Sequence, residues 1–246
     1  MPSLIETTVE TFAHAGIDLA ALGLAWARVM PAVTIVPAFG LRAIPAPARA
    51  ILGLALAACV VPAIAPTEPT AIASASSWPL LAIVEGARGL PVAIAAAVPL
   101  WAATMAGGVA DALRGAQETA ASPTVEGPAT PTGVALSLLA SAIFLSTGGP
   151  ARVVEALATR PDAAHPLLAA TTDLVNGITL AVALGGPLLA AAVVIEIAGA
   201  VVARAASPAQ VQALIAPLRA LGTLAVAGIV LDRLSVALAK AILASP

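Results

Sequence analysis

Long runs without a charged residue recur along this 246-residue chain and limit what it can fold into. They cover residues 50–67, 89–110, 127–151 and 174–195. A helix of about 18–25 residues is about 27–37 Å long, which matches the hydrocarbon core of a bilayer. The runs are apolar on every side, whereas the strands of a membrane barrel alternate apolar and polar residues. The pattern therefore predicts membrane-type helices.

Further apolar stretches cover residues 19–41, 205–218 and 222–231. The chain as a whole is 60% hydrophobic and 10% charged. Soluble domains are about 45–50% apolar and about 25% charged. We therefore expect an all-α, membrane-type protein with about six kinked apolar helices that form helical hairpins. We expect these helices to make one domain over residues 1–246 and to cross the membrane several times.

Prolines and glycines inside the apolar runs indicate that the helices pack against protein as well as lipid. The prolines are Pro31, Pro91, Pro99, Pro187 and Pro217. Each removes a backbone N–H and tends to bend its helix. The glycine pairs 107–108, 148–149 and 185–186 allow helix backbones to approach closely. These features favour a packed helical assembly over isolated spans.

Charged residues also lie within or beside the apolar runs: Arg28, Arg42, Arg49, Glu85, Arg88, Asp111, Arg114, Glu196, Arg204, Arg219, Asp232 and Arg233. A charge at the bilayer centre costs at least about 2.5–3.5 kcal/mol, so these groups must pair, face water or meet another subunit. Glu85 with Arg88, and Asp111 with Arg114, have the i, i+3 spacing that lets two side chains meet on one helix face. Pairing within a helix and contact between subunits both remain open.

The sequence contains none of the common catalytic or ligand-binding motifs. It has no nucleophile elbow, phosphate-binding loop or HExxH pair, and His14 and His165 are far apart. The single cysteine, Cys59, lies in an apolar run and is expected to be a buried small side chain. A net charge of −2 and 2% aromatic residues argue against nucleic-acid binding. We expect a non-enzymatic protein with no cofactor or bound metal.

Residues 26–62 read WARVMPAVTIVPAFGLRAIPAPARAILGLALAACVVP and combine five prolines with three arginines. Residues before proline avoid helical geometry, so a turn between two antiparallel helices is expected here. An arginine early in an apolar helix (Arg28), a Pro37-x-Phe39-Gly40 turn and a Pro45-x-x-x-Arg49 element follow one another. This order resembles the N-terminal signature of the FliR/SctT family, the export-apparatus proteins of bacterial type III secretion.

Three later blocks, residues 85–116, 143–157 and 181–207, resemble the same family, and the resemblance covers residues 15–235. The DALRGA and LSTGG sequences are more similar to the injectisome branch than to the flagellar branch. Two features depart from the family pattern. Residues 117–132 are rich in proline, and Pro150 replaces a more usual basic residue or histidine.

The resemblance implies a core subunit of the type III export gate in the bacterial inner membrane. Its partners would be SctR-, SctS- and SctU-like proteins, and unfolded protein substrates would pass through the channel that they form. The long polar break at residues 111–133 would be a plug-like loop. The plug and channel candidates are Gly107, Gly108, Asp111, Arg114 and Gly115.

The subunit-interface and turn candidates are Arg28, Pro37, Gly40, Arg42, Pro45, Arg49, Glu85, Arg88, Glu196 and Arg204. The alternative function is a small secondary transporter or permease subunit, since broken helices and intramembrane charge also suit transporters.

Overall fold

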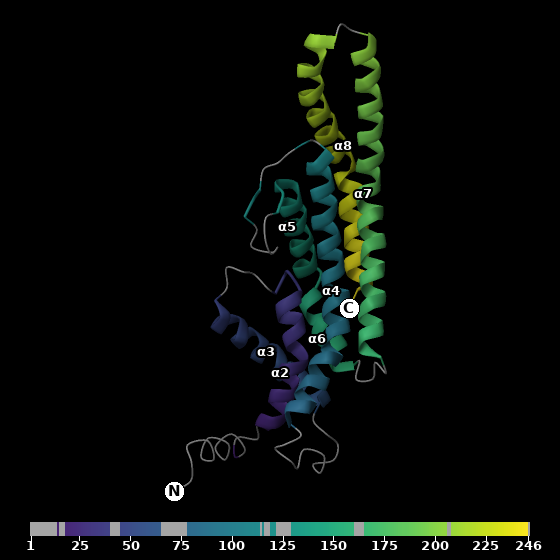
Figure 1. Cartoon of the computed structure of the whole chain (residues 1–246). Coiled ribbons are helices and arrows are strands. Elements are labelled where there is room, and N and C mark those ends of the chain that lie inside the picture. Colours follow the sequence, from purple (N-terminus) through teal and green to yellow (C-terminus); the bar gives the residue numbers. More distant parts are fainter. Residues whose placement is uncertain are drawn as a thin grey trace. The chain divides into compact units, whose positions relative to one another are not determined.

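A computed structural model gives the fold (Figure 1). It describes His14 and residues 18–39, 45–64, 78–113, 115, 119–121, 129–159, 165–205 and 208–245, without the side chains of residues 63, 64 and 208–216. These ranges hold seven helices: α2 (Leu19–Ile35), α3 (Ala46–Ile64), α4 (Trp78–Leu113), α5 (Pro131–Ser146), α6 (Gly149–Thr159), α7 (Pro166–Ala205) and α8 (Pro208–Ala244). The described residues contain no strand, only one isolated bridge between Ala120 and Ala129. The prediction of an all-α, membrane-type protein is confirmed.

The chain divides into two compact units. One comprises residues 1–96, 150–173 and 246, and the other comprises residues 97–149 and 174–245. The boundary between them falls within α4 and again within α7. A single domain over residues 1–246 stays a prediction.

In the first unit, α2 and α3 form the predicted pair of helices around the proline-rich turn. The carboxylate of Asp18 caps α2 by accepting from the N–H groups of Ala20 at 2.8 Å and Ala21 at 3.1 Å. The helix ends at Ile35 and the chain turns through residues 37–39. Pro45 precedes α3, and Pro47 lies in its first turn, where a missing N–H costs nothing. Residues 40–44, including Gly40 and Arg42, lie outside the described residues.

The packing of α3 against α2 uses one side of an apolar helix (Figure 1). A Cβ at Gly53 would lie 3.2 Å from Nε1 of Trp26, so the two helices approach closely there. Gly53, Ala57 and Val60 are buried on this side. Cys59 is exposed on another side, so the expectation that it is buried is wrong. Hydropathy could not distinguish the sides, because α3 is apolar around its whole circumference.

In the second unit, α7 and α8 run antiparallel beside each other (Figure 1). A Cβ at Gly222 of α8 would lie 3.0 Å from the side chain of Ile195 in α7. From residue 208 onward, the predicted runs 205–218 and 222–231 belong to one helix, α8, which continues through Pro217 and Arg219. The predicted run 127–151 is divided instead. Helix α5 stops at Ser146, and Gly148 adopts a φ of 74° before α6 begins.

Three helical segments are long and apolar enough to cross a membrane: Trp78–Leu113, Pro166–Ala205 and Pro217–Ala244. Helices α5 and α6 would provide a fourth if they count as one broken span. Helices α2 and α3 are shorter apolar helices. These assignments concern the described residues and rest on length and composition.

Candidate functional site

Two glycines of α4 bring its backbone against α2. A Cβ at Gly89 would overlap the carbonyl oxygen of Arg28, and a Cβ at Gly86 would lie 3.5 Å from the carbonyl oxygen of Ala27. The two glycines are three residues apart, so they lie on the same side of α4. This close approach places the side chain of Arg28 over Glu85, the residue just before the first glycine.

Arg28 and Glu85 form a buried ion pair between α2 and α4. Nε of Arg28 donates to Oε2 of Glu85 at 2.6 Å, and Nη2 of Arg28 pairs with the same oxygen. The two side chains are only 4% and 9% exposed. Buried charges require partners and hydrogen bonds to offset the loss of water. This pair supplies both, although its members are 57 residues apart in the sequence.

A third helix contributes a backbone carbonyl to the same arginine. Nη1 of Arg28 donates at 3.1 Å to the oxygen of Leu157 in the last turn of α6. In a helix, the donor for this oxygen would be the N–H four residues later, and Pro161 has none. A cation also suits the negative end of the α6 dipole. Arg28 therefore joins α2, α4 and α6 within the first unit.

Arg88 completes the network on its outer side. Its Nη1 donates to Oε1 of Glu85 at 2.7 Å, and its side chain is 38% exposed. The predicted i, i+3 pairing of Glu85 with Arg88 is confirmed. Both oxygens of Glu85 are thus occupied by arginines of the same chain.

A second polar cluster joins the end of α4 to the start of α5. The carboxylate of Asp111 is fully buried and accepts from Thr132, from the backbone N–H at 2.7 Å and from the hydroxyl at 2.6 Å. Thr130 caps α5 by accepting from the N–H of Gly133 at 3.4 Å. Pro131 has no N–H, so every early backbone donor of α5 has a partner.

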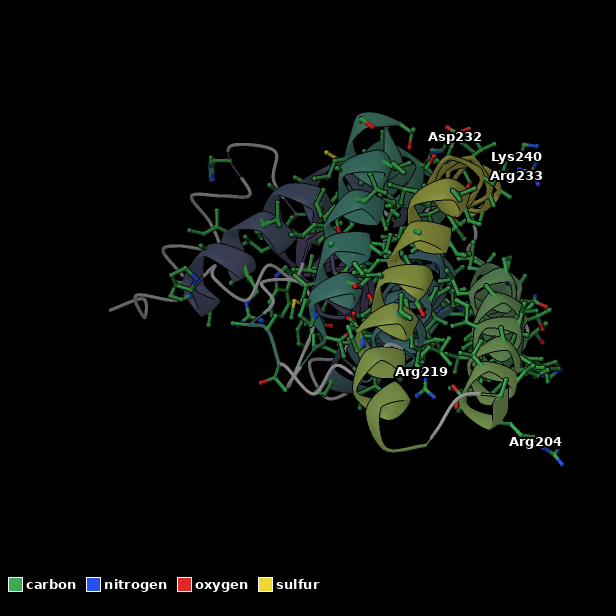
Figure 2. The ribbon with its side chains drawn as sticks, turned by 90° about the horizontal axis from the view of Figure 1, so that it is seen from above. Arg204, Arg219, Asp232, Arg233 and Lys240 are labelled. Atoms are coloured by element: carbon green, nitrogen blue, oxygen red, sulfur yellow. The ribbon has the colours of Figure 1, made fainter. Side chains whose placement is uncertain are left out.

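The third cluster lies between α7 and α8. Arg219 of α8 pairs with Glu196 of α7, with side chains that are 36% and 59% exposed. Figure 2 shows Arg219 directed toward α7 and Arg204 directed away from the hairpin. Arg204 lies in the last turn of α7, where a cation suits the helix dipole. Asp232, Arg233 and Lys240 lie together on the outer side of α8 in Figure 2.

The other predicted site residues are placed as follows. Pro37 is buried in the turn after α2, and Pro45 is exposed before α3. Arg49 is half-buried in α3, and its Nε is buried without a hydrogen-bond partner among the described residues. Gly107 and Gly108 lie in α4, and Gly115 adopts a φ of 74° just after it. Arg114 lies outside the described part of the chain, so its pairing with Asp111 stays a prediction.

Sequence reasoning missed the residues that connect these predicted positions. It did not pair Arg28 with Glu85, and it did not find Thr130, Thr132 or the carbonyl of Leu157. Two signals were present. Gly86 and Gly89 follow Glu85 at helix-contact spacing, and Pro161 stands four residues after Leu157. Neither signal says which distant helix supplies the partner.

A comparison with protein families identifies the chain. The family model for bacterial export proteins, family 1, matches residues 19–244, which include all seven described helices. The chain belongs to this family. No curated protein matches it. This export-family protein is therefore a bacterial export-apparatus component, and its apolar helices are those of a membrane protein.

Proposed function

We propose that this export-family protein is a non-enzymatic core subunit of the type III secretion export gate. In this role it helps to form and close the channel through which unfolded proteins cross the bacterial inner membrane. The observation that carries the proposal is the family match over residues 19–244. The DALRGA and LSTGG sequences favour the injectisome branch within that family.

The exposed surface of α7 and α8 supports a role inside an assembly. Large aliphatic side chains remain more than half exposed along both helices, for example Ile178 at 63%, Val194 at 65% and Ile229 at 78%. Lipid or other apolar helices must cover such a surface. We propose that SctR-, SctS- and SctU-like subunits cover part of it.

We also propose that residues 111–133 form a plug in the closed channel. The described residues at its base support this, because Asp111 and Thr132 hold its two ends together. The first and last residues of this segment are helical, since α4 runs to Leu113 and α5 starts at Pro131. In the sequence, Gly107 and Gly108 come just before Asp111, and Gly115 comes four residues after it.

A pull-down of the tagged chain in mild detergent, followed by mass spectrometry, tests the proposed function. SctR-, SctS- and SctU-like proteins should co-purify in fixed amounts. An unrelated multi-pass protein with the same tag, expressed in the same cells, is the control. A monodisperse chain without these proteins would contradict the proposal and would favour the transporter alternative.

A further inference from the structure

The charge of Asp111 is unfavourable at its position in α4 but favourable beside the first turn of α5. Asp111 lies two residues before Leu113, the last residue of α4, where the helix dipole is negative and a carboxylate is destabilised. The first turn of α5 presents N–H groups and the positive end of a second dipole to the same carboxylate. If α5 moved away, a buried carboxylate would keep the unfavourable dipole and lose the donors from Thr132. Separation of the two helices at this point is therefore costly.

The backbones of the two helices also meet at this junction. A Cβ at Gly107 would lie 2.6 Å from the backbone nitrogen of Gly133, so only glycine fits there. Further along the chain, the N–H of Ala120 donates to the oxygen of Ala129 at 2.7 Å. The segment between the helices is thus closed twice, first by Asp111 with Thr132 and then by this bridge.

We infer that Asp111 and Thr132 are positioning residues that hold the base of the 111–133 segment closed in the resting gate. This inference rests on the proposed function, in which the segment obstructs the channel. The side chains at the base, and not only the residues of the obstruction itself, keep the barrier in place. Opening this base for a substrate would require breaking both hydrogen bonds from Thr132 to the buried carboxylate of Asp111.

Cysteine labelling tests the closed base directly. The reporter is the full-length chain with Cys59→Ala and Ala129→Cys, because Ala129 is 7% exposed at the base. In membranes that contain the assembled complex, a water-soluble maleimide should label this cysteine slowly. Asp111→Asn or Thr132→Val should raise the labelling rate by about tenfold, since each weakens hydrogen bonds to a charged acceptor.

Two matched variants serve as controls. Thr132→Ser keeps both the N–H and the hydroxyl, so labelling should stay slow. Thr104→Val removes a hydroxyl that donates only to the carbonyl of Leu100 in α4 at 3.0 Å, and it should also leave labelling slow. An unchanged labelling rate in both Asp111→Asn and Thr132→Val would overturn the inference. If Asp111→Asn does not assemble, the milder Thr132→Val decides.

Ion leakage through vesicles that carry the assembled complex separates the inference from the proposed function. Asp111→Asn and Thr132→Val should leak while the partner subunits still co-purify in normal amounts. Deletion of residues 122–128 should leak as well. A leak with the deletion and none with the two substitutions would overturn the inference and leave the proposed plug standing. A tight membrane with the deletion would contradict the plug, and the labelling rates would still decide whether Asp111 and Thr132 hold the base closed.

Discussion

Arg28 is held by partners from two other helices of its own chain, so its substitution tests folding before it tests assembly. Its guanidinium is the only donor that reaches the Leu157 carbonyl among the interactions described, and it shares Glu85 with Arg88. Removal of one member of such a pair leaves the other charge buried and uncompensated.

Arg28→Ala should destabilise the detergent-solubilised complex by about 3–5 kcal/mol, the range for breaking a buried ion pair. Arg88→Ala should cost less than about 1 kcal/mol, because its side chain is 38% exposed and water can replace it. Thermal unfolding of the purified complexes measures both.

The double variant Arg28→Met with Glu85→Leu tests whether the loss of stability comes from an uncompensated buried charge. Apolar side chains that replace both charges should recover much of the stability. Equal losses of stability for Arg28→Ala and Arg88→Ala would show that the burial of the ion pair does not set the size of the loss.

Arg49 differs from Arg28 because its side chain is only half-buried, so part of it remains accessible to a neighbouring subunit. We expect a carboxylate of a neighbouring subunit to pair with it. Arg49→Ala should therefore reduce co-purification of the partner subunits, and Arg49→Lys should retain more of it. Normal assembly and normal secretion with Arg49→Ala would sink this assignment.

At the scale of single elements, the contact between α2 and α4 depends on Gly89, because a side chain there would meet the backbone of α2. Gly89→Ala should destabilise the protein by about 1–3 kcal/mol, the usual cost of adding a methyl group to a filled site. The new Cβ would overlap the Arg28 carbonyl, which belongs to the helix backbone and cannot rotate away.

Gly86→Ala provides the matched comparison one turn earlier in α4. Its Cβ would make an ordinary contact at 3.5 Å from the carbonyl of Ala27, and alanine favours a helix by up to about 1 kcal/mol over glycine. The thermal midpoint should stay the same or rise. A similar loss for Gly86→Ala and Gly89→Ala would mean that the close approach at Arg28 does not set the helix spacing.

The helices themselves were largely predictable, and their limits were not. The runs 89–110 and 174–195 lie inside α4 and α7, as hydropathy predicted. The same reasoning stopped α4 short of Glu85 and Arg88, because it treats every charge as a reason to end a span. In the structure α4 runs through both residues, and they pair with each other within it. The break at Gly148 was also missed, because a glycine with positive φ and a glycine within a helix look alike in a sequence.

At the scale of the whole molecule, the fold class and the family followed from the sequence, whereas the contacts of the candidate site did not. Hydropathy reports the environment of a residue averaged over its neighbours in the chain. The Arg28–Glu85 pair and the Asp111–Thr132 pair each join residues from separate helices, so their existence depends on tertiary packing. Of the two i, i+3 pairs that the sequence suggested, Glu85 with Arg88 could be confirmed.

The exposed aliphatic side chains of α7 and α8 lead to a prediction for the isolated chain. Without partner subunits, the purified protein should remain monodisperse only in detergent or lipid, because its apolar surface exceeds that tolerated by soluble monomers. Gel filtration before and after detergent removal measures this. A monodisperse chain in plain buffer would show that this surface is covered within the chain itself.

The joint between Asp111 and Thr132 also bears on how freely related chains can diverge. Because Asp111 and Thr132 join α4 to α5 directly, the spacing of the two helices at this joint does not depend on the length of the chain between them. For a flexible connection, doubling its length costs only about 0.6 kcal/mol. Chains related to this one should therefore tolerate changes of length between Asp111 and Thr132 without losing the contact between α4 and α5.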